Sequence, residues 1–259
     1  MKGHRNGEAW TGSIMHRNVI ITDLTRFSNP EIVCTAGIDC TDGQCVRPMP
    51  YLTKAKCREL RLGPGAVLSG NFFPALDAQG PHQEDYWYDT LRTQGVCTPS
   101  EFKAALRHGL FASVEEGFEA TLDRRQKHLP LGHPVRRSII TISVAPARIA
   151  VVGSPEKPEQ VKVHFVDPSG RNFSSISITD LGFHARASEY RARDDLTALN
   201  RRIQSQQEVL LRVGLSRDYS APDGRRGYWL QVNGVYTFPD FPTGIRLRRQ
   251  ERTHRQERQ

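Results

Sequence analysis

The sequence predicts a mainly β protein with a few helices, in which the strands form two small β-barrels in tandem. Segments of alternating hydrophobicity recur along the chain, and turn residues separate them. The clearest pair lies between Glu208 and Phe241, where Val209, Leu211 and Val213 alternate with other side chains and Tyr228–Val232 follows the same period. A two-residue period places neighbouring side chains on opposite faces of a strand. We therefore expect one buried face and one wet, grooved face with polar and aromatic groups.

Length and composition fit this class. A chain of 259 residues is long enough for one large or two small domains, each able to bury a core. Hydrophobic residues make up 37% and charged residues 25%, as in globular proteins that fold in water. No apolar run approaches the roughly 20 residues of a membrane helix, and the polar N-terminal stretch does not resemble a signal peptide. These features predict a cytoplasmic protein.

The first domain is expected over residues 18–122, after a polar, disordered tail over residues 1–17. Whether Met1 or Met15 is the native start stays open. Two strand-like segments, Ile32–Ile38 and Gln44–Met49, flank an Asp-Gly pair and predict a β-hairpin.

A further strand is predicted over Ala66–Phe73, and a linker or surface loop over Pro74–Gly95. Thr98–Glu101 has the cap, proline and glutamate of a helix start, which predicts a helix to about His108. A second short helix is possible over Ser113–Leu122. The basic, proline-containing segment 123–137 is expected to be the linker between the domains.

The second domain is expected over residues 138–245. Alternation predicts strands near Ile140–Val144, Val161–Phe165 and Phe173–Thr179, with a continuation over Ile149–Val152 after Pro146. Leucine and isoleucine at helical spacing predict a helix over about 194–206.

The formal net charge of +8 lies mostly at the ends of the chain. Residues 246–259 contain six arginines and two glutamates, and residues 1–17 contain three basic residues and one glutamate. Affinity for a phosphate backbone follows clustered positive charge, so the net charge alone does not make the barrels a basic surface. The basic C-terminal segment is expected to be a disordered tail, with a flexible electrostatic arm as the alternative.

Several strings resemble bacterial proteins that contain a dual OB domain, in which two small β-barrels follow one another. Gly214–Arg217 and Trp229–Asp240 are similar to the closing strands of that family. Ile32–Asp39 and Val46–Pro48 are similar to its opening hairpin, and the resemblance extends from about Asn18 to Arg246. It implies two tandem OB-like barrels and no established catalytic residues.

No metal or cofactor site is predicted. The cysteine spacing C-x5-C-x4-C-x11-C from Cys34 to Cys57 lacks the paired knuckles that hold zinc, and five cysteines do not suggest a disulfide framework. His82, Glu84 and Asp85 are close enough in sequence for acid–base chemistry, although surface loops often carry such residues without a chemical role. His184 presents the same ambiguity. Phosphate-loop, dinucleotide, esterase and metalloprotease motifs are absent.

Recognition of nucleic acid is the remaining function class, because OB-type barrels present aromatic rings for base stacking and basic side chains for phosphates. The candidates are the arginines and aromatic residues of the predicted strands and turns: Arg47, Arg212, Arg217, Arg225, Arg226, Trp229 and Tyr236. Trp229 and Tyr236 are equally consistent with a core or interdomain position. Arg47 is equally consistent with a buried ion pair, and Arg212 and Arg217 with simple solvent exposure.

Two function hypotheses follow. The first is a non-catalytic accessory protein that binds nucleic acid, single-stranded in particular, or a nucleotide, in a bacterial DNA-processing or defence system. The second is a protein-interaction scaffold that docks onto a separate enzyme. A hydrolase centred on His82, Glu84 and Asp85 is a more distant third.

Overall fold

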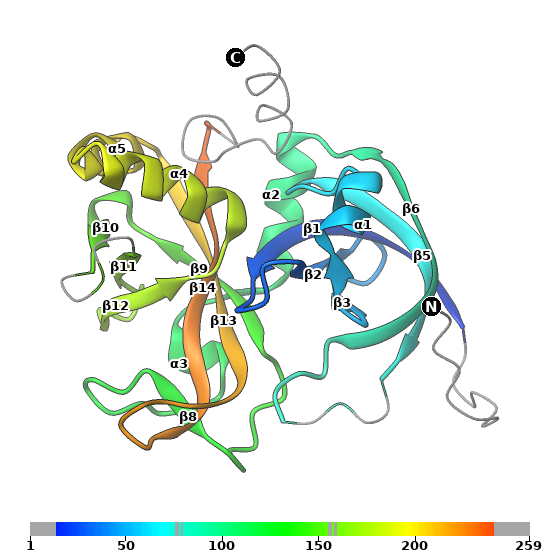
Figure 1. The fold of residues 1–259 in the computed structure, drawn as a ribbon, viewed down its shortest axis with the longest axis horizontal. Helices are drawn as coiled ribbons and strands as arrows, with labels where there is room; N and C mark the ends of the chain where they lie inside the picture. The colour runs from blue at the N-terminus through cyan, green and yellow to red at the C-terminus, as the bar shows by residue number, and fades with distance from the viewer. Residues whose placement is uncertain (1–13, 76–77, 79, 155–156, 158–159, 241–259) are drawn as a thin grey trace.

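The protein forms two β-barrels that lie side by side, with helices at their edges (Figure 1). The computed structural model describes residues 14–75, 78, 80–154, 157 and 160–240. Residues 1–13 and the predicted C-terminal tail lie outside this range. The elements of the first barrel are β1 (Met15–Arg26), β2 (Ile32–Asp39), β3 (Cys45–Met49), β4 (Leu52–Thr53), α1 (Lys54–Glu59), β5 (Ala66–Pro74) and β6 (Asp85–Val96).

Five strands close the first barrel in the order β1-β5-β6-β3-β2-β1, with β4 added beside β2. Only β3 and β6 are parallel, and every other pair is antiparallel. Gly43 takes the positive φ of 71° that the turn between β2 and β3 requires, which explains the Asp-Gly signal. The arrangement is the five-stranded Greek-key barrel expected for an OB-like domain.

The second barrel repeats this order. Its elements are β8 (His128–Pro130), β9 (Ile139–Val144), η1 (Pro146–Arg148), β10 (Ile149–Gly153), β11 (Val161–Val166), β12 (Asn172–Ile178), α4 (Leu181–Ala192), α5 (Leu196–Gln204), β13 (Glu208–Ser220) and β14 (Arg226–Phe238). Pro146 interrupts the first strand, so that its halves β9 and β10 pair with β13 and β11. The parallel pair β12–β14 corresponds to β3–β6, and the helices α4 and α5 stand where α1 stands. The predicted tandem of OB-like barrels is therefore confirmed.

The segment that joins the barrels packs with both of them: its first part contacts β1 and β2, and the rest packs with the second barrel. It contains α2 (Pro99–His108), β7 (Leu110–Phe111) and α3 (Val114–Gly117), and β7 pairs with β9. Apolar side chains throughout 114–135 are buried in the core of the second barrel, and β8 pairs with β14. We propose that residues 114–137 belong to the second barrel rather than to the first barrel or a linker, and that the domain boundary precedes β7.

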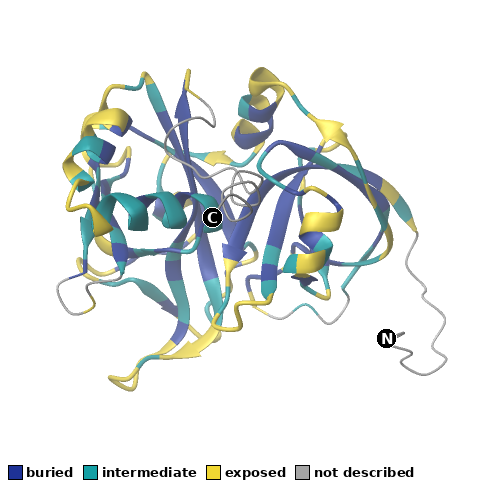
Figure 2. Ribbon diagram, turned by 45° about the horizontal axis from the view of Figure 1, so that its top comes forward, coloured by how far each residue is buried: buried dark blue, intermediate teal, exposed yellow. Residues whose placement is uncertain are grey.

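An apolar cluster lies between the barrels and joins them. We call it the shared cluster: Ile20, Ile38, Phe102, Ala105, Leu106, Leu210, Tyr236 and Phe238. It takes side chains from β1 and β2, from helix α2, and from β13 and β14, so three parts of the chain meet in it. Figure 2 shows these central strands as buried, whereas the far end of the β13–β14 hairpin is exposed.

Contact between the barrels explains why one prediction from alternation is wrong. In β13, Val209 and Leu211 face the core of the second barrel, and Leu210 and Arg212 face the first barrel. Both faces are buried in the first part of the strand, so the wet face predicted there does not exist.

Buried ion pairs accompany the shared cluster. Arg212 Nη2 donates to Asp23 Oδ2 at 2.8 Å, and each side chain is only 1% exposed. Arg212 also donates to the Thr141 hydroxyl at 3.1 Å, and Tyr236 donates to the backbone carbonyl of Thr22. Burial alone would lower the pKa of Arg212, but the Asp23 carboxylate raises it overall. The guanidinium therefore stays charged and holds β13 against β1.

Local signals predicted some elements well and missed others. The expected helix at Thr98 is α2 with a complete capping box, and the helix over 194–206 is α5. The expected loop over 74–95 is wrong, because β6 occupies Asp85–Val96; its outer half is exposed and so carries no apolar pattern. The second short helix is shorter than expected, at four residues. Residues 15–17, expected in the tail, begin β1, where Arg17 pairs with Asp39 at 2.7 Å.

Replacement of Arg212 by methionine leaves the Asp23 carboxylate buried without its cation. Because an unpaired buried charge is strongly unfavourable, we expect the free energy of unfolding to fall by about 3 kcal/mol or more. Urea unfolding followed by circular dichroism measures this change. The control is Lys56→Met, which removes an exposed pair with Glu59 and is expected to have little effect. Equal stability of the two variants would contradict a structural role for the Arg212 pair.

The half-buried imidazole of His184 in α4 makes stability depend on pH. Burial, followed by the nearby charges of Arg26 and Lys162, lowers the pKa of His184 to about 4. An unfolded histidine takes up its proton near pH 6.5, so between these values the unfolded chain binds more protons. Stability is therefore expected to fall as pH falls from about 6.5 towards 4.

Thermal unfolding across this pH window, compared with His184→Gln, isolates the contribution of the imidazole. The variant is expected to lose less stability than the parent chain on acidification. Identical pH profiles would show that His184 does not titrate differently on folding.

Candidate nucleic-acid interface

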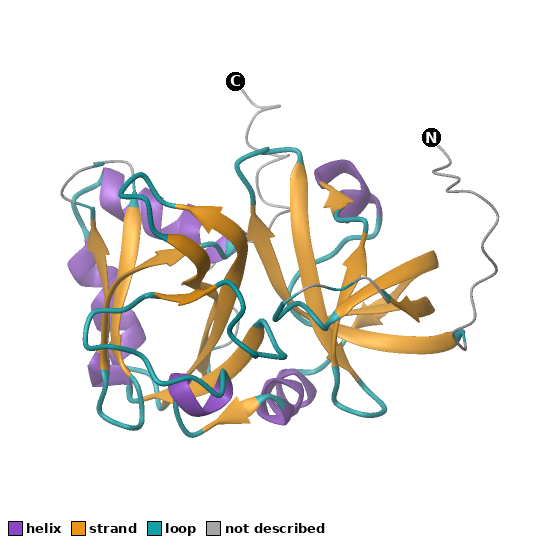
Figure 3. Cartoon of the chain, turned by 90° about the horizontal axis from the view of Figure 1, so that it is seen from below, coloured by secondary structure: helices purple, strands orange, loops and turns teal. Residues whose placement is uncertain are grey.

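The two barrels use different faces to contact each other. The first barrel contributes the outer side of β1, β2 and β3, through Ile20, Ile38 and the buried Arg47. The second contributes β13 and the end of β14. Strands β11 and β12 lie on the far side of the second barrel, away from the first, in both views of the chain (Figures 1 and 3). The first barrel therefore leaves their outer side uncovered, and helix α4 packs against part of β11.

Hydrogen bonds and an ion pair stabilise the rest of the interface between the barrels. Arg47 donates to Asp85 at 2.7 Å and to the Ser138 hydroxyl at 2.6 Å. Glu84 accepts from the backbone N–H of Ser138 at 2.6 Å and of Ile139 at 3.2 Å. These bonds tie β3 and the start of β6 to the start of β9.

The open side of β11 and β12 carries basic and hydroxyl side chains. Lys162 Nζ donates to the Ser177 hydroxyl at 2.9 Å, and the His164 ring lies 3.3 Å from the Ser175 hydroxyl. Both bonds join β11 to β12. The side chains that form them are part-buried or exposed. The surface between the strands is thus polar and rich in hydrogen-bonding groups.

An aromatic stack stands beside this surface, where β8 pairs with β14. The rings of His128 and Trp229 are stacked, with centroids 4.7 Å apart and planes inclined by 20°. The guanidinium of Arg225 lies over the Trp229 ring at 5.0 Å, and the Trp229 indole N–H donates to the carbonyl of Tyr219 at 3.2 Å. Tyr219 itself is 53% exposed. Flat groups and a cation are therefore available at the surface.

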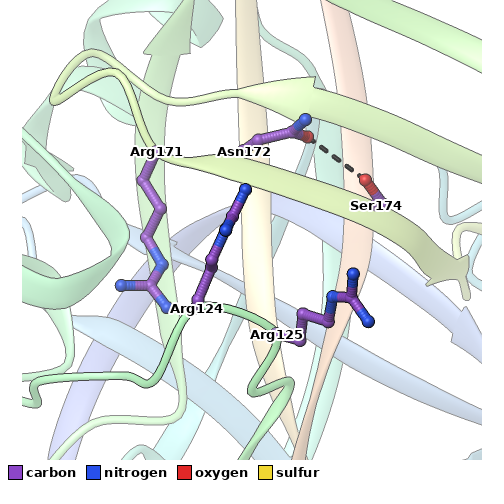
Figure 4. A pocket seen from close by; sticks show the side chains of 5 residues that line it. All are labelled: Arg124, Arg125, Arg171, Asn172 and Ser174. Carbon is purple, nitrogen blue, oxygen red and sulfur yellow. Dashed lines mark hydrogen bonds between the residues drawn. The ribbon is translucent and has the colours of Figure 1, made fainter.

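A pocket of about 540 Å³ opens at the start of β12 (Figure 4). Its lining consists of Arg124, Arg125, Arg171, Asn172 and Ser174. Arg171 pairs with Glu115 at 3.0 Å, whereas Arg124 and Arg125 have no ion pair within the part of the chain that the structure describes. The pocket therefore has an excess of positive charge.

Burial and, after it, neighbouring positive charges lower the pKa of three basic groups near this surface. Burial and then the charge of Arg225 lower the pKa of Lys127. Burial and then Lys127 lower the pKa of His164, and burial and then Arg225 lower the pKa of His128. Lys127 directly precedes His128, and its backbone carbonyl accepts from the Leu230 N–H of β14 at 2.8 Å, so the residue lies beside the aromatic stack. We call these residues together the basic face: Arg124, Arg125, Lys127, His128, Lys162, His164, Arg171, Arg225 and Trp229.

The residues selected from the sequence separate into two groups. Arg225, Arg226 and Trp229 lie at the exposed hairpin, where Arg226 pairs with Asp218 and Arg225 with Asp223. Arg47, Arg212 and Tyr236 are buried between the barrels. This position matches the alternative interpretations of Arg47 and Tyr236, whereas the alternative for Arg212, solvent exposure, is wrong because its side chain is only 1% exposed. Arg217 lies at the border, with a side chain 37% exposed, and donates to Asp85 at 2.8 Å and to the Tyr51 hydroxyl at 2.6 Å.

The possible catalytic residues are also buried. His82 packs edge-on against Tyr228, while Glu84 and Asp85 form the contacts between the barrels described above.

Burial raises the pKa of the Cys45 thiol to about 12 despite the nearby Arg212. Across the described residues, no group of three or more histidines, cysteines or acids is placed to hold a metal ion. Within the same ranges, no helix has the length and apolar character needed to cross a membrane.

Sequence reasoning missed most of the basic face. The run Arg124-Arg125-Gln126-Lys127-His128 was noticed as basic but assigned to the linker. Its packing against β14, through the Leu230 N–H and the carbonyl of Lys127 at 2.8 Å, is a long-range contact with no local signature.

Comparison with known proteins places the chain in a family. No curated protein matches the sequence. Among solved structures, the chain is similar to the Ifi202 HINa domain in complex with a 20-base-pair double-stranded DNA. That similarity has a TM-score of 0.33 and 7% identity over 87% of this chain and 95% of the other, and it carries no functional argument. The family model of the dual OB-containing domain matches residues 19–235, so the chain belongs to the dual OB-containing domain family.

Proposed function

We propose that this protein binds single-stranded nucleic acid on the basic face of its second barrel. The observation that carries the proposal is that Lys127 and Arg225 lie beside the stacked rings of His128 and Trp229. Single strands are held by basic groups that follow the phosphates and by flat groups on which bases stack. The basic face combines both.

The position of this face within the barrel supports the proposal. OB barrels bind oligonucleotides with their second and third strands and with the loops after the first and fourth strands. In the second barrel these elements are β11, β12 and the turn between β13 and β14, which carries Arg225. The corresponding strands β2 and β3 of the first barrel lie against the second barrel. The ligand is therefore expected on the second barrel alone.

More specifically, we propose that the protein is a non-catalytic accessory protein of a bacterial DNA-processing or defence system. Its support is that His82, Glu84 and Asp85 are buried in structural contacts rather than facing the basic face. Chemistry on the bound strand would then belong to a separate enzyme.

Removal of two cations from the basic face tests the proposal. We expect Lys127→Ala/Arg225→Ala to weaken binding of a short mixed-sequence single-stranded DNA by about tenfold or more. The slope of log affinity against log salt should become shallower by about 1.4, because each lost phosphate contact contributes about 0.7 for a single strand. Fluorescence anisotropy at several salt concentrations measures both quantities. Arg92→Ala, at an exposed arginine of the first barrel, is the matched control and should bind as the parent chain does.

A variant chain that ends at Gly244 separates the contribution of the C-terminal arginines from that of the basic face. If the basic face is the site, this shorter chain is expected to retain the preference for single strands over duplex and the sensitivity to Trp229→Ala. Loss of all binding on truncation would assign the affinity to the tail instead. Absence of binding to DNA, RNA and duplex by the full chain would refute the proposal and favour the scaffold hypothesis.

A further inference from the structure

The pocket at the start of β12 holds more positive charge than contact with an internal phosphodiester requires. A phosphodiester carries one negative charge, and one arginine is sufficient to pair with it. Three arginines line this pocket, and only Arg171 has a carboxylate partner among the described residues. The guanidinium charges of Arg124 and Arg125 are therefore left without a carboxylate partner among the described residues.

We propose, on the basis of the proposed function, that this pocket binds the terminal phosphomonoester of the nucleic-acid strand. A phosphomonoester carries a charge of about −1.5 to −2 near pH 7 and presents three acceptor oxygens. Arg124 and Arg125 match that charge. An internal phosphodiester would leave part of it unbalanced.

The polar side chains of the pocket add donors in fixed positions. Ser174 donates to Asn172 Oδ1 at 3.2 Å, so the amide N–H groups of Asn172 take no part in this bond (Figure 4). Arg171 is oriented by Glu115 and by the backbone carbonyl of Asp123. Arg171 has further N–H groups beyond these two bonds. The lining therefore contains donors and almost no competing acceptor.

The pocket also lies at one end of the basic face. Arg125 and Lys127 are two residues apart, a separation of at most about 7 Å along the chain. His128 follows directly and stacks on Trp229. A strand whose end is held in the pocket would thus pass Lys127 and reach the aromatic stack. The volume of about 540 Å³ leaves room for the terminal sugar and its phosphate.

The experiment compares three oligonucleotides of one sequence, each with an internal fluorophore: one with a 5′-phosphate, one with a 3′-phosphate and one with hydroxyl groups at both ends. We expect the full chain to bind one of the phosphorylated strands about tenfold or more tightly than the hydroxyl-ended strand. The preferred strand identifies which end enters the pocket.

Variants separate the pocket from the rest of the face. Arg124→Ala/Arg125→Ala should abolish the preference for the phosphorylated end while hydroxyl-ended strands still bind. Trp229→Ala should weaken binding of all three strands by a similar factor. Arg136→Ala, at an exposed arginine of the same segment outside the pocket, should retain the preference.

Equal affinity for the three strands would overturn the pocket assignment and leave the proposed function intact. Failure of every strand to bind would overturn both. A preference that persists in Arg124→Ala/Arg125→Ala would also overturn the assignment, because end recognition would then lie elsewhere on the molecule.

Discussion

The buried pair of Arg212 and Asp23 fixes how the two barrels meet, and the remaining surfaces follow from that contact. Two charges removed from water are tolerated only with close geometry and additional hydrogen bonds, which Thr141 and Thr22 provide here. Because the pair specifies one mutual arrangement, the shared cluster can close around it. Strands β2 and β3 are then covered, whereas β11 and β12 stay open.

Two barrels of one topology thus have different tasks. The first barrel uses the outer side of its second and third strands to hold the second barrel, and we propose that the second barrel keeps the equivalent side for a ligand. The break at Pro146 separates β9 from β10 and exposes the edge of β10. Asn200 of α5 covers this edge by bonding both the N–H and the carbonyl of Val151, at 2.7 and 2.9 Å. An unpaired strand edge is thereby protected.

Sequence reasoning succeeded where the signal was local and failed where it depended on the contact between the barrels. The cap at Thr98 and the turn at Gly43 are decided by neighbouring residues, and both were predicted correctly. The strand period around Arg212 cannot show that the other barrel covers its outer face. The sequence therefore placed Arg212 among the ligand contacts, although it forms a buried ion pair. The basic run at Arg124 shows the opposite error, because only folding brings it beside β12. Helix α4 was missed because few of its side chains are buried.

Hydrogen–deuterium exchange of the full chain, with and without a single-stranded oligonucleotide, tests most directly whether the ligand face belongs to the second barrel alone. Slower exchange is predicted at residues 124–129, across β11 and β12, and at the turn after β13. Strands β2 and β3 should exchange equally slowly in both states, because the second barrel already covers them. Protection centred on the first barrel, around His16 and Arg92, would contradict the account.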